Sequence, residues 1–161
     1  DENSWNGTID EKMGDAQKAI ACYLFTVPGV PLLYNGQEAD LDKRLEFFKR
    51  DPIEWKETEL TPFYTKLVHL RTSHPALRHG IEGGSYDVLK TSNQSVVAYK
   101  RVKGDGEVLT ILNMSNKPVT VALKDGATAG SYKDIFTDAG VEIAQGSKMQ
   151  MEPWGYMVLV K

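Results

Sequence analysis

The chain has 161 residues, of which 41% are hydrophobic and 25% are charged, and it carries a net charge of −3. Its acids and bases are evenly mixed, which argues against nucleic acid as a partner, because phosphate binding requires clustered Lys and Arg. Every apolar stretch is shorter than the roughly 18 residues that suggest a membrane span. The single cysteine, Cys22, excludes an internal disulfide and a thiolate cluster, and we expect it to be a buried, inert thiol.

The first predicted element is a helix that begins near residue 9. Thr8 and Glu11 have the spacing of a capping box, with Thr8 as the N-cap. Apolar residues then recur at steps of three and four, which predicts an amphipathic helix of about four turns. The residues of this stripe are Ile9, Met13, Ala16, Ile20, Tyr23 and Val27. Pro28 and Gly29 follow it and end the helix.

A short apolar run over residues 30–35 comes next and lies between two turn signals. Continuous apolarity favours a strand buried on both faces, as in a parallel sheet covered by helices. Residues 36–60 are predicted to form a long polar loop, and such loops are often functional. A second helix is predicted from Thr61, followed by Pro62 at the first helical position, to the residue before His74.

From about residue 83 the pattern changes to alternating β-rich segments separated by Gly, Asn and Asp turn signals. Short strands at this spacing predict an antiparallel sandwich or barrel. The chain is therefore α+β by content, with a division near residue 80. The strand predicted over residues 30–35 needs sheet neighbours that the rest of the first half does not supply. Either the β-rich half covers this strand, or the first half is part of a larger α/β domain.

Residues 28–38, with the sequence PGVPLLYNGQE, resemble a stretch of the α-amylase superfamily, glycoside hydrolase family thirteen. In that family the stretch forms the eighth and last strand of a (β/α)₈ barrel and the loop after it. Leu70-Arg71 and residues 75–80 resemble the last barrel helix and its exit. The resemblance implies that residues 1–80 are the C-terminal part of a (β/α)₈ catalytic barrel. It also implies that residues 81–161 are the antiparallel β-sandwich that follows the barrel.

The first five residues, DENSW, resemble the continuation of an Asn-His-Asp motif that ends the seventh barrel strand. This implies that Asp1 is the third catalytic-site carboxylate, which holds the hydroxyls of the distorted sugar ring. Trp5 either stacks on a sugar or packs on the loop after the eighth strand. Lys43 and Arg44 lie where related enzymes place groups near the substrate cleft. They either contact sugar hydroxyls or form ion pairs with neighbouring acids, and Glu38 is expected to order the loop.

By this resemblance the parent protein is a retaining glycoside hydrolase that acts on α-glucans such as starch and maltodextrins. Retaining hydrolysis requires a nucleophile and an acid/base carboxylate about 5–5.5 Å apart, and the family carries both on earlier strands. The acids of the 36–60 loop are interpreted as a solvated face, so we expect the chain alone to be inactive. The resemblance leaves open the choice between α-1,4 and α-1,6 bonds and between hydrolysis and glycosyl transfer. It favours an extracytoplasmic location, which the sequence itself does not fix.

We expect no cofactor or metal in this chain, because the calcium sites of the family lie mainly in an insertion that is absent here. His69, His74 and His79 also do not share one helical face. The alternative function is a non-catalytic carbohydrate-binding or interaction module based on the sandwich, which would need a row of exposed aromatic residues on one sheet face. Residues 1–35 are expected to present apolar faces that pack onto the sandwich or pair with another copy.

Overall fold

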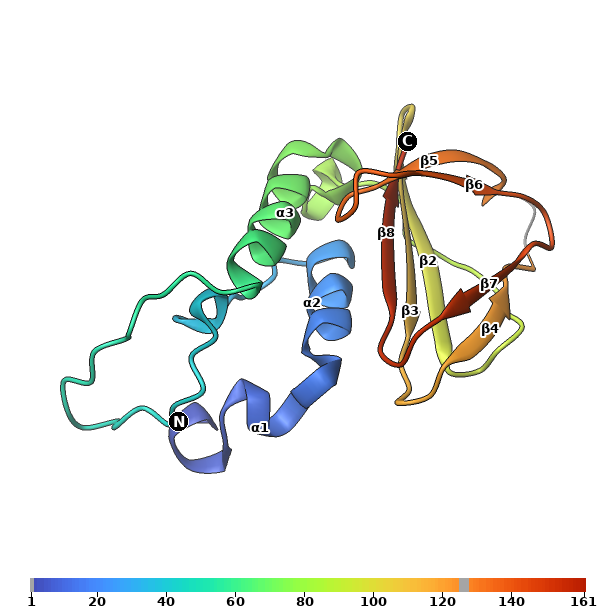
Figure 1. Ribbon diagram of the computed structural model, residues 1–161. Helices are drawn as coiled ribbons and strands as arrows, with labels where there is room; N and C mark the ends of the chain where they lie inside the picture. Colours follow the sequence, from blue (N-terminus) through green and yellow to red (C-terminus); the bar gives the residue numbers. More distant parts are fainter. Residues whose placement is uncertain (1, 125–127) are drawn as a thin grey trace.

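A computed structural model of the chain describes residues 2–124 and 128–161 and places a helical part beside a β-sandwich (Figure 1). The longer helices of the helical part are α2, Gln17–Thr26, and α3, Leu60–Ser73. The shorter helical turns are η1 Glu2–Asn6, α1 Ile9–Met13, η2 Gly14–Ala16, η3 Gln37–Ala39, η4 Pro75–Leu77 and η5 Gly80–Glu82. The predicted α+β class is confirmed.

The predicted first helix begins as expected but is interrupted. Thr8 caps α1 through a complete capping box, in which the Thr8 hydroxyl accepts from the Glu11 N–H and the Glu11 carboxylate accepts from the Thr8 N–H. The prediction of one continuous helix is wrong, because Gly14 has a φ of 45° and ends α1. The 3₁₀ turn η2 then connects α1 to α2.

The predicted apolar stripe is also not the face that α2 buries. The buried residues of α2 are Ala19, Ala21, Cys22, Phe25 and Thr26. Ile20 is only partly buried and Tyr23 is exposed. Both sides of this helix are apolar in sequence, and the side that the sheet covers is the one that becomes core. Cys22 lies on that side and is fully buried, as expected.

Residues 30–35 do not form the predicted buried strand. They are extended, they belong to no sheet of the described residues, and Val30 and Leu32 are exposed. The physical reason is that a strand needs a hydrogen-bonded neighbour, and the edge of the sandwich does not reach this segment. The segment between η3 and α3 has no regular structure and α3 ends at His74, as predicted. The predicted start of this helix is wrong, because α3 begins at Leu60 with Glu59 at the N-cap position, and the Thr61 hydroxyl donates to the Glu38 carbonyl instead of capping the helix.

The second half is an antiparallel sandwich, as predicted. One sheet has the strand order β1-β2-β3-β8-β5-β6, and β4 pairs with β7. The strands are β1 Asp87–Val88, β2 Val96–Lys103, β3 Gly106–Asn113, β4 Val119–Ala122, β5 Gly130–Asp134, β6 Gly140–Ile143, β7 Lys148–Met151 and β8 Tyr156–Val160. One apolar core fills the sandwich, and a second joins α2 and α3 to β3 and β8.

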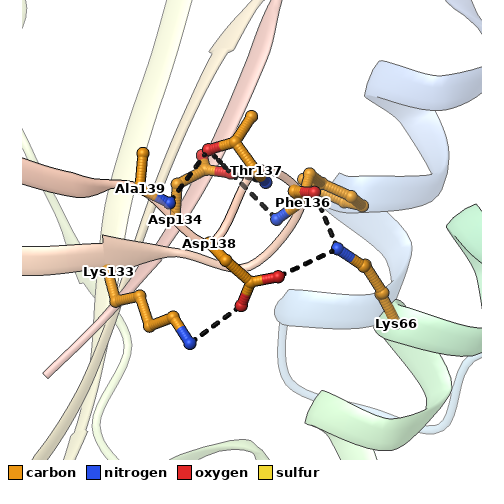
Figure 2. Close-up of polar contacts among 7 residues, drawn as sticks. All are labelled: Lys66, Lys133, Asp134, Phe136, Thr137, Asp138 and Ala139. Carbon is orange, nitrogen blue, oxygen red and sulfur yellow. Dashed lines mark hydrogen bonds and ion pairs between the residues drawn. The ribbon is translucent and has the colours of Figure 1, made fainter.

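The turn between β5 and β6 fastens α3 to the sandwich (Figure 2). Lys66 of α3 donates to the Phe136 carbonyl oxygen at 2.7 Å and pairs with Asp138, which also pairs with Lys133. The buried carboxylate of Asp134 shapes the turn by accepting hydrogen bonds from two backbone N–H groups and one hydroxyl. Phe63 of α3 stacks on Phe136 with ring centroids 5.0 Å apart. The helical part and the sandwich therefore share one continuous interface.

Candidate functional site

The segments that carry the predicted site residues lie together at the end of the helical part far from the sandwich (Figure 1). Polar side-chain contacts between described residues join the N-terminal segment to the loop after η3. The Thr8 hydroxyl donates to Asp42, and the Arg44 guanidinium pairs with Glu11 at 2.8 Å. Asp1, the predicted catalytic-site carboxylate, lies outside the described residues.

Trp5 is part of an aromatic cluster that we define as Trp5, Phe47 and Phe48. The Trp5 ring lies 4.8 Å from Phe47 between centroids, and Phe47 meets Phe48 edge to face at 5.0 Å. Trp5 thus packs on the loop while 54% of its surface stays exposed, and Phe48 is 87% exposed. Sequence reasoning did not assign Phe47 or Phe48 to the site. The available signal was a pair of adjacent aromatic residues in an otherwise charged loop.

Arg44 and Lys43 both form ion pairs with acids close to them. Arg44 binds Glu11 through Nε at 3.0 Å as well as through Nη2. This hydrogen bond, together with the Thr8 N–H, lowers the pKa of Glu11. Lys43 pairs with Asp51, whose pKa is lowered first by Lys43 and then by the Glu46 N–H. These contacts are the ion pairs that sequence analysis offered as the alternative to sugar contacts.

A cavity of about 460 Å³ lies between the two arms of the loop after η3. Its lining residues are Asp40, Leu41, Asp42, Lys43, Pro52, Ile53, Glu54 and Lys56. Its lining includes three carboxylates and two amines, so its wall offers both hydrogen-bond acceptors and donors.

Glu38 contributes to the loop through its backbone. Its carbonyl oxygen accepts a hydrogen bond from Thr61 at 2.9 Å, which joins η3 to α3. Its carboxylate Oε2 is buried and has no hydrogen-bond partner among the described residues. Within residues 2–124 and 128–161 no group of three His, Cys, Asp or Glu side chains is placed to hold a metal ion, and no helix is long and apolar enough to cross a membrane.

The sandwich does not present a row of exposed aromatic residues on the part of the chain that the structure describes. Tyr156 packs on Phe63 and Phe136, and Tyr132 and Tyr99 are buried. Trp154 is partly buried in the turn before β8. The feature that would favour a carbohydrate-binding module on the sheet face is therefore missing from these residues.

Comparison with known proteins places this architecture in a family. Residues 86–158 match the family model described as the maltogenic amylase C-terminal domain. The α-amylase MalA of Haloarcula japonica is 31% identical over 142 residues, which cover 83% of this chain and 21% of the relative. Neopullulanase 2 of Thermoactinomyces vulgaris is 30% identical over 91% of this chain and 26% of its own length.

The fold agrees with these sequence relationships. The crystal structure of a maltogenic α-amylase, AmyB of Thermotoga neapolitana, superposes with a TM-score of 0.75 and 24% identity. The match covers 91% of this chain and 36% of that structure. The chain spans about a fifth to a quarter of the length of the two curated relatives. On the combined evidence of sequence and fold, the chain belongs to the α-amylase family, glycoside hydrolase family thirteen.

Proposed function

We propose that the chain is the C-terminal part of a retaining glycoside hydrolase that acts on α-glucans such as starch and maltodextrins. The observation that carries this proposal is the order of elements: a helix, an extended apolar segment, a second helix and a sandwich. This order matches amylases over nine-tenths of the chain. The two curated relatives are about 3.5 to 4 times as long as this chain, so in this proposal the activity belongs to a longer protein.

In this proposal, residues 1–80 are the C-terminal part of the barrel, and residues 81–161 form the sandwich. The extended segment over residues 30–35 supports the barrel assignment, because it has the conformation of a strand but no strand neighbour among the described residues. A barrel places each strand between two others. The shared interface of α3 with the sandwich fits a sandwich that buttresses the end of a barrel.

Asp1 acts in this proposal as the carboxylate that holds the sugar ring hydroxyls. Trp5 stacks on a pyranose, which its half-exposed ring supports, because an aromatic face suits the C–H surface of a sugar. Arg44 and Lys43 donate to sugar hydroxyls in this proposal, and their ion pairs with Glu11 and Asp51 fix the positions of both side chains.

The chain alone is inactive in this proposal, because retaining hydrolysis needs two carboxylates about 5–5.5 Å apart in separate roles. Neighbouring groups already engage three acids of the N-terminal segment and the loop after η3. Glu11 pairs with Arg44, Asp51 pairs with Lys43, and Asp42 accepts from Thr8. None of the three is left as an unengaged nucleophile.

A reducing-sugar assay on starch, maltodextrin and pullulan tests the proposal with two proteins, the 161-residue chain and the longer protein that contains it. We expect turnover only from the longer protein. In that protein Asp1→Asn lowers kcat, whereas Trp5→Ala mainly raises KM. Absence of turnover by the longer protein would contradict the assigned activity, and turnover by the chain alone would contradict its inactivity.

A further inference from the structure

The loop after η3 is held on the start of α1 by a group of residues that we call the loop anchor: Thr8, Glu11, Asp42 and Arg44. The Thr8 hydroxyl donates to the Asp42 carboxylate. The Arg44 guanidinium donates to Glu11 Oε2 through Nε at 3.0 Å and through Nη2 at 2.8 Å. These two contacts join residues that are 34 and 33 positions apart in the sequence. The loop anchor therefore connects two separate segments of the chain.

The two side chains that cap α1 are the same ones that reach the loop. Glu11 Oε2 accepts from the Thr8 N–H at 2.8 Å as well as from Arg44. The Thr8 hydroxyl accepts from the Glu11 N–H at 3.1 Å and donates its own proton to Asp42. Because the capping box fixes the direction of both side chains, it also fixes where they meet the loop.

Gly7 leaves the space that this arrangement needs. It is buried and has a φ of 118°, a conformation that favours glycine. A Cβ at this position would lie 2.7 Å from Glu11 Oε2. A side chain there would therefore displace the carboxylate from Thr8 and from Arg44. The loop anchor thus depends on the backbone at Gly7 as well as on its own polar contacts.

The loop anchor lies between the side chains that are proposed to meet the glucan. Trp5 precedes Thr8 by three residues, and its ring packs on Phe47, which follows Arg44 by three residues. This aromatic contact is open to solvent, since Trp5 is 54% exposed and Phe47 is 53% exposed. We therefore expect the polar contacts of the loop anchor to fix how far Trp5 and Arg44 lie from each other.

We propose that Glu11 and Asp42 are positioning residues for glucan binding, which hold the loop after η3 on the start of α1. This inference rests on the proposed glycoside hydrolase function. Glu11 orients the Arg44 guanidinium, and Asp42 keeps the loop beside Trp5, so that both side chains reach the same stretch of glucan. A contact of this kind stabilises bound substrate and transition state alike, so its loss raises KM and leaves kcat unchanged.

Steady-state kinetics of the longer protein on maltodextrin test the inference. Glu11→Gln removes the charge that holds Arg44 but keeps an oxygen for the Thr8 N–H, and Asp42→Ala removes the acceptor of the Thr8 hydroxyl. The double variant raises KM about fivefold or more, while kcat stays within about twofold. Asp42→Asn keeps an acceptor oxygen, so its KM stays within about twofold of the parent value. The matched control is Glu46→Gln, which removes an ion pair within the same loop and leaves both constants unchanged.

Tryptophan fluorescence of the 161-residue chain gives a second measurement that requires no activity. In a background with Trp55→Phe and Trp154→Phe, Trp5 is the remaining tryptophan. The Glu11→Gln/Asp42→Ala substitutions release the loop from Trp5, so its emission shifts to longer wavelength and acrylamide quenches it more strongly. Glu46→Gln changes neither property. Circular dichroism confirms that each variant is folded.

The two measurements separate failure of this inference from failure of the proposed function. Turnover by the longer protein with an unchanged KM in the double variant overturns the inference alone, as does a rise in KM that Glu46→Gln reproduces. Absence of turnover contradicts the proposed function, and the role of the loop anchor in glucan binding fails with it. An emission spectrum of Trp5 that the double substitution leaves unchanged overturns the loop anchor itself, whatever the activity.

Discussion

Arg101 offers the sharpest test of how the two halves of the chain are held together. Its side chain extends from β2, is almost completely buried, and donates to three carbonyl oxygens from two separate segments. These are Ser85 at 2.7 Å, Gly84 at 3.2 Å and Thr26 at 3.2 Å. No carboxylate of the described residues pairs with it. Its positive charge faces the C-terminal end of α2, where helix carbonyls are unpaired and the helix dipole is negative.

Arg101→Met keeps most of the apolar stem but removes every donor. Three carbonyls then lose a charge-assisted partner, at about 1 kcal/mol each or somewhat more if no water replaces it. The substitution also removes the cost of desolvating the buried charge, which offsets part of this loss in stability. We therefore expect the free energy of unfolding to fall by about 2–3 kcal/mol, which for a chain of this size lowers Tm by about 4–12 °C.

Urea unfolding followed by tryptophan fluorescence and by circular dichroism measures the change in the free energy of unfolding. The matched control is Arg50→Met, because Arg50 is an exposed arginine in the loop before α3, and it should change stability by less than about 0.5 kcal/mol. Arg101→Lys should fall between the two, since one ammonium cannot reach all three carbonyls. If Arg101→Met lowers the free energy of unfolding by no more than Arg50→Met does, Arg101 does not hold the two halves of the chain together and the reasoning is refuted.

Three further predictions concern the same interface. Lys66→Met should lower the free energy of unfolding by about 1 kcal/mol, because it removes a partly exposed ion pair and one charged hydrogen bond to the β5–β6 turn. Hydrogen exchange should become faster in residues 134–139. Asp134→Ala should lower the free energy of unfolding by about 2 kcal/mol, since it leaves two turn N–H groups without their acceptor. An unchanged urea midpoint would argue against a role of this turn in holding α3 on the sandwich. Burial lowers the pKa of His74 from 6.5, and its Nδ1 accepts from a backbone N–H of η4. The unfolded state then binds the proton more tightly, so the contribution of His74 to stability is full above about pH 6.5 and is lost as the pH falls through that value to the lower folded pKa. His74→Ala should flatten this part of the stability profile, and an equally steep profile in the variant would contradict the assignment.

Local signals in the sequence predicted the features that depend on neighbouring residues alone. The capping box at Thr8, the end of α3 at His74 and the alternating strands of the sandwich all formed as expected. Each of these depends on hydrogen bonds or steric preferences within a few residues. The break at Gly14 was missed, because a glycine inside an apolar stripe is compatible both with a continuous helix and with a helix end.

The choice of buried face could not be predicted for α2. Ile20, Tyr23 and Leu24 are as apolar as Cys22 and Phe25, so periodicity alone supports more than one face. The partner decides, and the sheet of the sandwich covers the side with Cys22 and Phe25. Arg101 escaped notice for a similar reason: an arginine is ordinarily a surface residue, even where it shares a strand face with an aromatic residue such as Tyr99. Only the tertiary structure places the Thr26 carbonyl of α2 and the carbonyls of Gly84 and Ser85 around it.

The same reasoning explains why the candidate site is the least predictable part of the chain. Residues 30–34 adopt the extended, alternating conformation that their sequence favours, so local preference is satisfied there. A strand is nevertheless defined by its hydrogen-bonded neighbours, and local preference cannot supply them. The loop that follows carries Arg44, Phe47 and Phe48, and it begins directly after this segment. Whatever chain pairs with residues 30–34 therefore also affects the positions of Trp5, Lys43 and Arg44, which contact or belong to this loop.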